Sequence, residues 1–112
     1  MWPEPKQANI QGKVLLLVCS VDTVRQQVIC KGRALPLTPV EYRLLVLLLS
    51  RPGQVFARAR MLDHLHQDFR DVSDRAIDSH IKNIRRKLDQ CGVQDTTIAS
   101  VYGVGYRYDV AG

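Results

Sequence analysis

Apolar residues recur along the chain at helical spacing in one long segment, Asp74–Leu88. The aliphatic residues of this segment fall on one narrow stripe, as in a helix packed against a core; they are Ile77, Ile81, Ile84 and Leu88. Long polar side chains take the opposite face, namely Arg75, Ser79, Lys82 and Arg86, with Asn83 beside them. The pattern predicts a helix with a buried aliphatic back and a polar front.

Another helix is predicted to begin at Thr38. Thr38 is a good N-cap, Pro39 suits the first helical position, and Glu41 stands three residues after the cap, which completes a capping box. Apolar residues cover more than half of the circumference, and Pro52-Gly53 ends the helix. We expect it to be the most buried helix of the domain.

A shorter helix is predicted from Arg58 to about His66, after a short extended link, Gln54–Phe56. Its inward residues are Met61, Leu62 and Leu65. The polar loop Gln67–Ser73 follows, and Ser73 or Asp74 caps the next helix. A helix, a loop and then a basic helix is the order of a helix-turn-helix, here with a long turn.

The segment before these helices is predicted to form a small antiparallel sheet over Lys13–Leu37, preceded by a polar tail or linker remnant at residues 1–12. Its strands are predicted at Val14–Cys19, Val24–Cys30 and Arg33–Leu37, with a hairpin turn at Lys31-Gly32.

A β-hairpin is predicted to follow the basic helix. Thr96–Val101 is rich in β-forming residues, Tyr102–Gly105 is a turn, and Tyr106–Val110 is the returning strand. A hairpin placed directly after such a helix is the arrangement called a wing. The order of elements therefore predicts an α+β winged helix-turn-helix over residues 13–110.

Composition and charge narrow the class of partner. The chain has 112 residues, enough for one domain with a core of its own, and it is 46% hydrophobic and 24% charged. The net charge of +5 favours polyanions, and five Lys or Arg residues stand between Arg75 and Lys87 against one acid, Asp78. A helix with this polar face suits the major groove of DNA. The alternative is an ordinary surface helix with a solvated charged face.

The cysteines and the apolar runs indicate the cellular compartment in which the protein works. Cys19, Cys30 and Cys91 form no C-x-x-C pair and are odd in number, which favours buried thiols in a reducing cytosol. A Cys19–Cys30 bridge between neighbouring strands is the alternative. The longest apolar runs are too short to span a bilayer and no signal peptide is visible, so we expect a cytoplasmic protein without a membrane partner.

No catalytic, cofactor or metal motif is present in the sequence. Gly103-x-Gly105 lacks the third glycine and the following helix of a nucleotide-binding fingerprint. The histidines have no helical metal-pair spacing, and His80 is as compatible with packing as with donation to a phosphate. We therefore expect no cofactor, no metal and no enzymatic activity.

Three separated motifs resemble the DNA-binding effector domain of OmpR/PhoB-type response regulators. They are LPLTPVEYRLLVLLLSRPGQVFARARML, DRAIDSHIKNIRRKL and IASVYGVGYRY. They occur in the family's order and spacing, and the resemblance covers about Val14–Tyr108. Within the family, QDFRDVSDRAIDSHIKNIRRKLD and SVYGVGYRY are most similar to one regulator of an envelope-stress two-component system.

The resemblance implies a winged helix with an N-terminal four-stranded antiparallel sheet, so a fourth strand would arise by splitting around Asp22-Thr23. It also implies roles for single residues. Positions matching the family's base readers are Ala76, Asp78, Ser79, Lys82 and Asn83. Positions matching its phosphate contacts are Arg75, His80, Arg85, Ser100 and Tyr106, to which the charge pattern adds Arg86, Arg58 and Arg60.

The loop and the wing also have implied roles. Asp68, Phe69, Arg70 and Asp71 correspond to the segment that touches RNA polymerase in activators of this type. The wing comprises Tyr102, Gly103 and Gly105, and Tyr102 stands where many relatives have an arginine that enters the minor groove. Tyrosine cannot supply that cation, so packing against sugar or backbone is expected instead.

These observations predict a sequence-specific double-stranded DNA-binding domain of a two-component transcription regulator. The family's receiver domain is absent, so we expect an effector domain cut from a longer protein that also works with a receiver domain and a sensor kinase. Family members bind direct-repeat operators as two copies, which implies a dimer on DNA. The rival hypothesis is a winged-helix protein-interaction module with an acidic partner; the basic face, however, has no aromatic anchor of the interface type.

Overall fold

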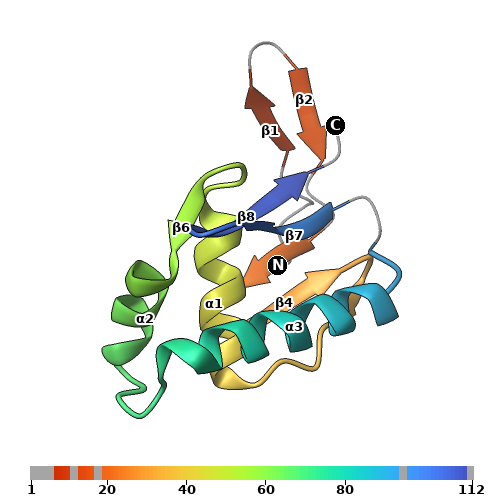
Figure 1. Cartoon of the computed structure of the whole chain (residues 1–112). Coiled ribbons are helices and arrows are strands. Elements are labelled where there is room, and N and C mark those ends of the chain that lie inside the picture. Colours follow the sequence, from red (N-terminus) through yellow and green to blue (C-terminus); the bar gives the residue numbers. More distant parts are fainter. Residues whose placement is uncertain (1–6, 11–12, 17–18, 94–95, 111–112) are drawn as a thin grey trace.

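The N-terminal strands form two small sheets in the computed structural model, which describes residues 7–10, 13–16, 19–93 and 96–110. Strand β1 (Gln7–Ile10) pairs antiparallel with β2 (Lys13–Leu16), and this hairpin stands away from the rest of the molecule (Figure 1). Part of the expected tail is therefore a strand. Among the residues that the structure describes, β1 and β2 pair with each other and not with β3–β5, so the implied four-stranded sheet is not confirmed.

The second small sheet has the order β3-β4-β5, built from Cys19–Asp22, Gln27–Cys30 and Arg33–Ala34. The prediction of a single strand over Val14–Cys19 is wrong, since its residues belong to two strands of different sheets, with 17–18 outside the described residues. The chain does turn after Asp22, as the implied split required. The Asp22 carboxylate accepts the backbone N–H groups of Val24 and Arg25, both at 3.1 Å, and so stabilises this turn.

The expectation of free thiols is wrong for Cys19 and Cys30, which form a disulfide. The two residues are direct partners in the β3–β4 register, with Cα atoms 4.1 Å apart, and both side chains are buried. Cys91 remains a free thiol and lies beside this pair, donating to the Cys30 carbonyl oxygen at 3.3 Å. The odd number of cysteines said nothing about which two would face each other across a strand pair.

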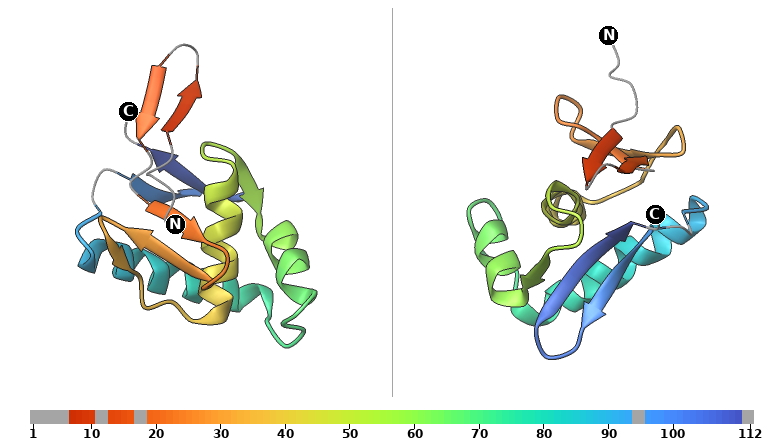
Figure 2. Two further views of the ribbon diagram at one scale, coloured as in Figure 1. Left: turned by 180° about the vertical axis from the view of Figure 1, so that it is seen from behind. Right: turned by 90° about the horizontal axis from the view of Figure 1, so that it is seen from above.

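Helix α1 (Pro39–Ser50) begins as predicted. The Thr38 hydroxyl accepts the Glu41 N–H at 3.2 Å, and the Glu41 carboxylate accepts the Thr38 N–H at 3.0 Å, so the capping box is confirmed. Leu44, Leu45 and Leu48 are fully buried. Figure 2 shows α1 between the β3–β5 sheet and the C-terminal sheet, which is why its apolar residues run around most of its surface.

Helices α2 (Arg58–His66) and α3 (Asp74–Gln90) are also confirmed, with α3 two residues longer than predicted. Ser73 is the N-cap of α3, and its hydroxyl accepts the Ala76 N–H at 3.3 Å. Both helices pack against α1 and against each other, and α3 runs along the outside of the molecule (Figure 1).

The C-terminal sheet has the order β6-β8-β7, formed by Val55–Ala57, Gly105–Val110 and Thr96–Val101. The wing hairpin of β7 and β8 is confirmed. Strand β6, predicted only as an extended link, pairs Phe56 with Tyr106 and Ala57 with Gly105. The wing is thus hydrogen-bonded to the segment that leads into α2. In the described part of the chain, no helix has the length and apolar character needed to cross a membrane.

Candidate nucleic-acid interface

Helix α3 turns its polar face outward. Ile77, Ile81 and Ile84 are fully buried and Leu88 is 3% exposed, so the aliphatic stripe is covered by the core. On the opposite side, exposed side chains form a continuous row, consisting of Arg75, Ser79, Lys82 and Arg86. Asn83 is half-buried beside this row, and Ala76 is half-buried at its beginning. Because the four side chains of the row are exposed, none of the three sheets covers them.

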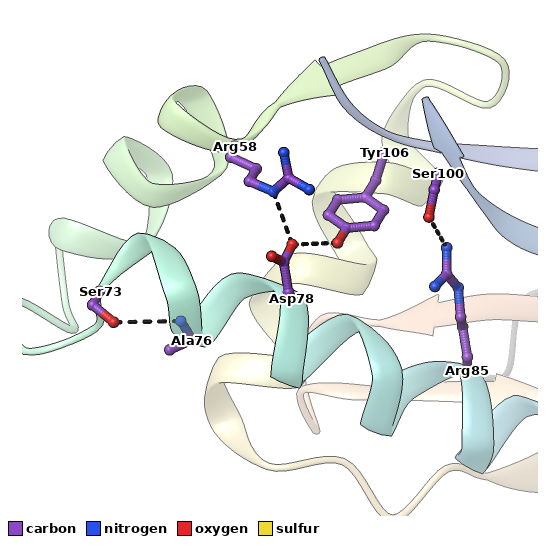
Figure 3. A network of polar contacts seen from close by, with 7 residues as sticks. All are labelled: Arg58, Ser73, Ala76, Asp78, Arg85, Ser100 and Tyr106. Atoms are coloured by element: carbon purple, nitrogen blue, oxygen red, sulfur yellow. Dashed lines mark hydrogen bonds and ion pairs between the residues drawn. The ribbon is translucent and has the colours of Figure 1, made fainter. Parts of the chain in front are cut away.

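Asp78 is the acid of this face, and it is held by two other elements (Figure 3). Its Oδ1 accepts a hydrogen bond from Nε of Arg58 on α2 at 2.8 Å and another from the hydroxyl of Tyr106 on β8. The Tyr106 bond, followed by the Arg58 bond, holds the pKa of Asp78 below its ordinary value. Asp78 is therefore ionised at neutral pH, and its charge is balanced locally.

Tyr106 lies between two cationic side chains. The guanidinium carbons of Arg58 and Arg85 are each 5.5 Å from the centroid of the Tyr106 ring. The residue is only 5% exposed. Burial and the bond to Asp78 together raise the pKa of Tyr106, so its hydroxyl keeps its proton. The sequence predicted each of these residues at the interface but not their contacts with one another.

Arg85 joins α3 to the wing. Its Nε donates to the Ile98 carbonyl oxygen at 2.8 Å. Its Nη2 donates to the Ser100 hydroxyl at 2.7 Å, as Figure 3 shows. These bonds leave other guanidinium hydrogens for an outside acceptor, because the group has five N–H donors. The Ser100 hydroxyl accepts from Arg85 and keeps its own proton to donate. Arg85 and Ser100, both of which were predicted to contact phosphates, thus lie on the same surface.

Two further predicted phosphate contacts, Arg60 and His80, differ in their exposure to solvent. Arg60 is exposed at the start of α2, with its guanidinium carbon 5.7 Å from the Phe56 ring. His80 is half-buried, and its Nδ1 is buried without a hydrogen-bond partner among the described residues. Only the other ring nitrogen of His80 is thus suited to donate outward.

The wing tip is uncharged. Tyr102 is fully exposed and Val104 is 49% exposed, while Gly103 supplies the positive φ of +74° that the turn needs. Between Ala99 and Tyr106 the sequence contains no Lys or Arg. Because β8 is paired on both sides, the tip is presented beside α3 on a firmly anchored strand.

The loop between α2 and α3 is held at several points. Phe69 packs against the core, Asp68 forms an ion pair with Arg43 of α1, and the Val72 carbonyl oxygen lies 2.9 Å from Nε2 of His66. Arg70 and Asp71 are exposed. Asp68 is exposed as well, but its carboxylate is paired with Arg43.

One ion pair behind the polar face was missed by sequence reasoning. Lys87 of α3 donates to the Glu41 carboxylate that caps α1, and the Glu41 side chain is 3% exposed. Burial raises the pKa of Glu41, but the bonds from Lys87 and from the Thr38 amide outweigh it, and the pKa lies below its ordinary value. One of the basic residues of α3 is therefore structural. Helical spacing could have indicated this, because Lys87 falls off the polar row.

A helix-turn-helix whose third helix has an outward polar face, with an anchored hairpin beside it, defines a winged-helix domain. The family model described as "Transcriptional regulatory protein, C terminal" matches residues 32–108, and the chain belongs to this family. The predicted resemblance to OmpR/PhoB-type regulators is thereby confirmed. The chain is a domain of a transcriptional regulator and not an enzyme.

Individual relatives agree with this assignment. The transcriptional regulatory protein BaeR of Escherichia coli O6:H1 is 51% identical over 89 residues, which cover 80% of this chain and 37% of BaeR. The DNA-binding domain of the response regulator AdeR, solved in complex with an intercistronic region, is 31% identical with a TM-score of 0.74; the match covers 86% of this chain and 98% of that domain.

The Klebsiella pneumoniae RstA DNA-binding domain, solved in complex with the RstA box, has a TM-score of 0.67 and 27% identity. That match covers 82% of this chain and 91% of the RstA domain. The chain spans less than half of the length of BaeR.

Proposed function

We propose that this domain binds double-stranded DNA with sequence preference, with α3 in the major groove. The observation that carries the proposal is the exposed row of polar side chains on α3, including Lys82 and Arg86, on a helix whose other side is buried. The major groove, about 12 Å wide, admits such a helix and offers acceptors and donors on base edges. The AdeR and RstA domains, both solved with DNA, support the same use of this fold.

Within α3, Lys82 and Asn83 are the principal base readers. Lysine donates to the guanine acceptors, and the asparagine amide can pair with adenine. Other side chains of the same face line the groove beside them, namely Ala76, Asp78 and Ser79. Contacts to phosphates set the register and come from a wider ring, formed by Arg75, Arg86, Arg85, Arg58, Arg60, His80 and Ser100.

The wing lies over the adjacent minor groove. Tyr102 and Val104 offer no cation to that groove, so the tip packs against sugars and backbone. Gly103 lies at the turn of the hairpin, where no side chain obstructs its approach to the duplex. The wing consequently adds contact area but little dependence on salt, because salt dependence follows the number of phosphates neutralised.

The longer regulator adds further partners to this proposal. This regulator comprises a receiver domain that responds to a sensor kinase, and it acts in the cytoplasm. Two copies of it bind a direct-repeat operator whose half-sites lie about one helical turn apart. The loop with Arg70 and Asp71 at its surface contacts RNA polymerase. The anchoring of this loop through Phe69 and Asp68 supports that role, because a presented surface must keep its shape.

A mobility-shift assay tests the proposal. The domain is incubated with random-sequence duplex at low salt, and then with duplexes selected by the domain from a random library. We expect a shift at micromolar protein with random duplex and a much tighter complex with selected duplexes. No shift with either, together with binding to an acidic protein surface, would favour an interaction module instead.

A further inference from the structure

The hydroxyl of Tyr106 has one proton, and that proton is already used in a hydrogen bond within the protein. It is donated to Oδ1 of Asp78, an ionised carboxylate. A phosphate oxygen has no proton to offer in return, so it can only accept a hydrogen bond. Tyr106 can therefore contact a phosphate as a donor only if it gives up Asp78. That exchange would leave the Asp78 charge with Arg58 alone.

The ring of Tyr106 also makes contacts within the protein. Arg58 from α2 and Arg85 from α3 each place their guanidinium group 5.5 Å from the ring centroid, and the residue is 5% exposed. Figure 3 shows the tyrosine entering from the wing strand, with its hydroxyl pointing at Asp78 of α3. One side chain of the wing strand thus contacts residues of both α2 and α3.

We propose that Tyr106 is a positioning residue which sets the base preference of Asp78 and does not contact a phosphate. The inference rests on the proposed DNA binding of this same surface. It departs from the role that the resemblance to the family implied for Tyr106, and the departure comes from the hydrogen bond and the burial observed here.

The geometry of Asp78 explains how the effect reaches DNA. Both internal bonds, from Arg58 and from Tyr106, end on Oδ1. In the ranges that the structure describes, no hydrogen bond reaches Oδ2, and the side chain is 51% exposed. A carboxylate oxygen in the major groove accepts from the N4 amino group of cytosine. Tyr106 and Arg58 therefore hold the carboxylate in one orientation while leaving an acceptor free for a base.

The test compares Tyr106→Phe, Asp78→Asn and the double variant with the wild type. Phenylalanine keeps the ring between the two arginines and removes only the hydroxyl. Each protein is titrated against a duplex selected by the wild type, against the same duplex with the Asp78-dependent base pair replaced, and against random duplex. Tyr42→Phe is the matched control, because Tyr42 is a buried tyrosine of α1 outside this surface.

We expect Tyr106→Phe to reduce the preference for the selected duplex by roughly fivefold, the value of one ordinary hydrogen bond, and to leave binding to random duplex unchanged. In the Asp78→Asn background the same substitution should have no further effect. Equal weakening on every duplex, or full additivity of the two substitutions, would overturn the proposal, because a direct phosphate contact behaves in that way.

A second measurement separates this inference from the proposed function. Carboxyl titration of Asp78 by NMR needs no DNA, and Tyr106→Phe should raise the pKa of Asp78 while Tyr42→Phe leaves it unchanged. An unchanged Asp78 pKa in Tyr106→Phe refutes the positioning role even if DNA binding is confirmed. Should Tyr106→Phe fail to fold, the half-exposed Asp78→Asn decides: unchanged base preference in that variant overturns the proposal.

Discussion

Gly105 passes so close to Phe56 that a Cβ atom added to it would lie 1.9 Å from the Phe56 carbonyl oxygen. Gly105 begins β8 and pairs with Ala57 of β6. The close approach therefore lies where the wing strand pairs with the strand that leads into α2. Any side chain at this position would push the two backbones apart. The absence of a side chain thus fixes how closely the wing is seated on the domain.

Gly105→Ala should lower the free energy of unfolding by about 3 kcal/mol, because the clash is with backbone atoms that cannot move aside independently. Denaturant unfolding followed by circular dichroism measures the change. Gly103→Ala is the control: its φ of +74° makes alanine unfavourable, but nothing lies within 4 Å of the added atom, and about 1 kcal/mol is expected. Gly105 has no positive φ, so the backbone term of Gly103→Ala does not apply to it, and equal losses in the two variants would contradict the predicted clash with Phe56.

The helices could be predicted from sequence because their signals are local. The capping box of Thr38 and Glu41 and the aliphatic stripe of α3 depend on residues three or four positions apart. Strand β6 has three residues, too few to show a period, and it exists only because β8 pairs with it. The split of the N-terminal strands likewise depends on pairing partners, which a single strand pattern does not specify.

The candidate interface was predictable as a set of residues but not as a network. Arg58, Asp78 and Tyr106 come from three elements, and Asp78 lies 20 and 28 positions from the other two. Their residue types suggested contacts to DNA for each. Only the packing of α2, α3 and the wing shows that these side chains also bind one another, which changes the role inferred for Tyr106.

Lys87→Met should destabilise the domain by about 3 kcal/mol, because it leaves the buried Glu41 carboxylate without its cation. Thermal and urea unfolding measure the loss. Arg86→Met is the matched control, since Arg86 is the exposed neighbour on α3 and its loss should change stability by less than about 0.5 kcal/mol.

The same ion pair predicts a dependence on pH. The pKa of folded Glu41 lies below its ordinary value, so the unfolded chain binds its proton first as the pH falls. The stabilisation is therefore complete above the ordinary glutamate pKa and is lost as the pH falls from there through the lowered pKa. The difference in the free energy of unfolding between the wild type and Lys87→Met should therefore be largest above the ordinary glutamate pKa and should shrink as the pH falls through the lowered pKa. A difference that stays constant over this pH range would contradict the assignment.

Asn83→Ala should relax base choice at one operator position, at a cost of about 1–3 kcal/mol on the preferred sequence. Asn83 is half-buried at the edge of the polar row of α3. Competition between operator variants measures the effect. Unchanged preference among the variants would remove Asn83 from the base readers, whatever the loss of affinity.

Arg86→Ala should weaken binding to all duplexes alike and reduce the slope of log affinity against log salt by about 0.9, the contribution of one phosphate neutralised. Arg86 suits this test better than Arg85, whose bonds to Ile98 and Ser100 also tie α3 to the wing. Titrations at several salt concentrations provide the slope. Arg51→Ala, at the C-cap of α1, removes the same charge outside α3 and the wing and should leave the slope unchanged.

Reduction of the Cys19–Cys30 disulfide should lower the free energy of unfolding by about 3 kcal/mol, since the bridge closes a segment with a sequence separation of 11. Unfolding with and without dithiothreitol measures the difference. Cys91→Ser keeps the bridge and removes the free thiol beside it, so this variant should still respond to the reductant. Cys19→Ser should not respond. A wild type that is indifferent to dithiothreitol, with three titratable thiols before any reductant is added, would show that the bridge does not form in solution.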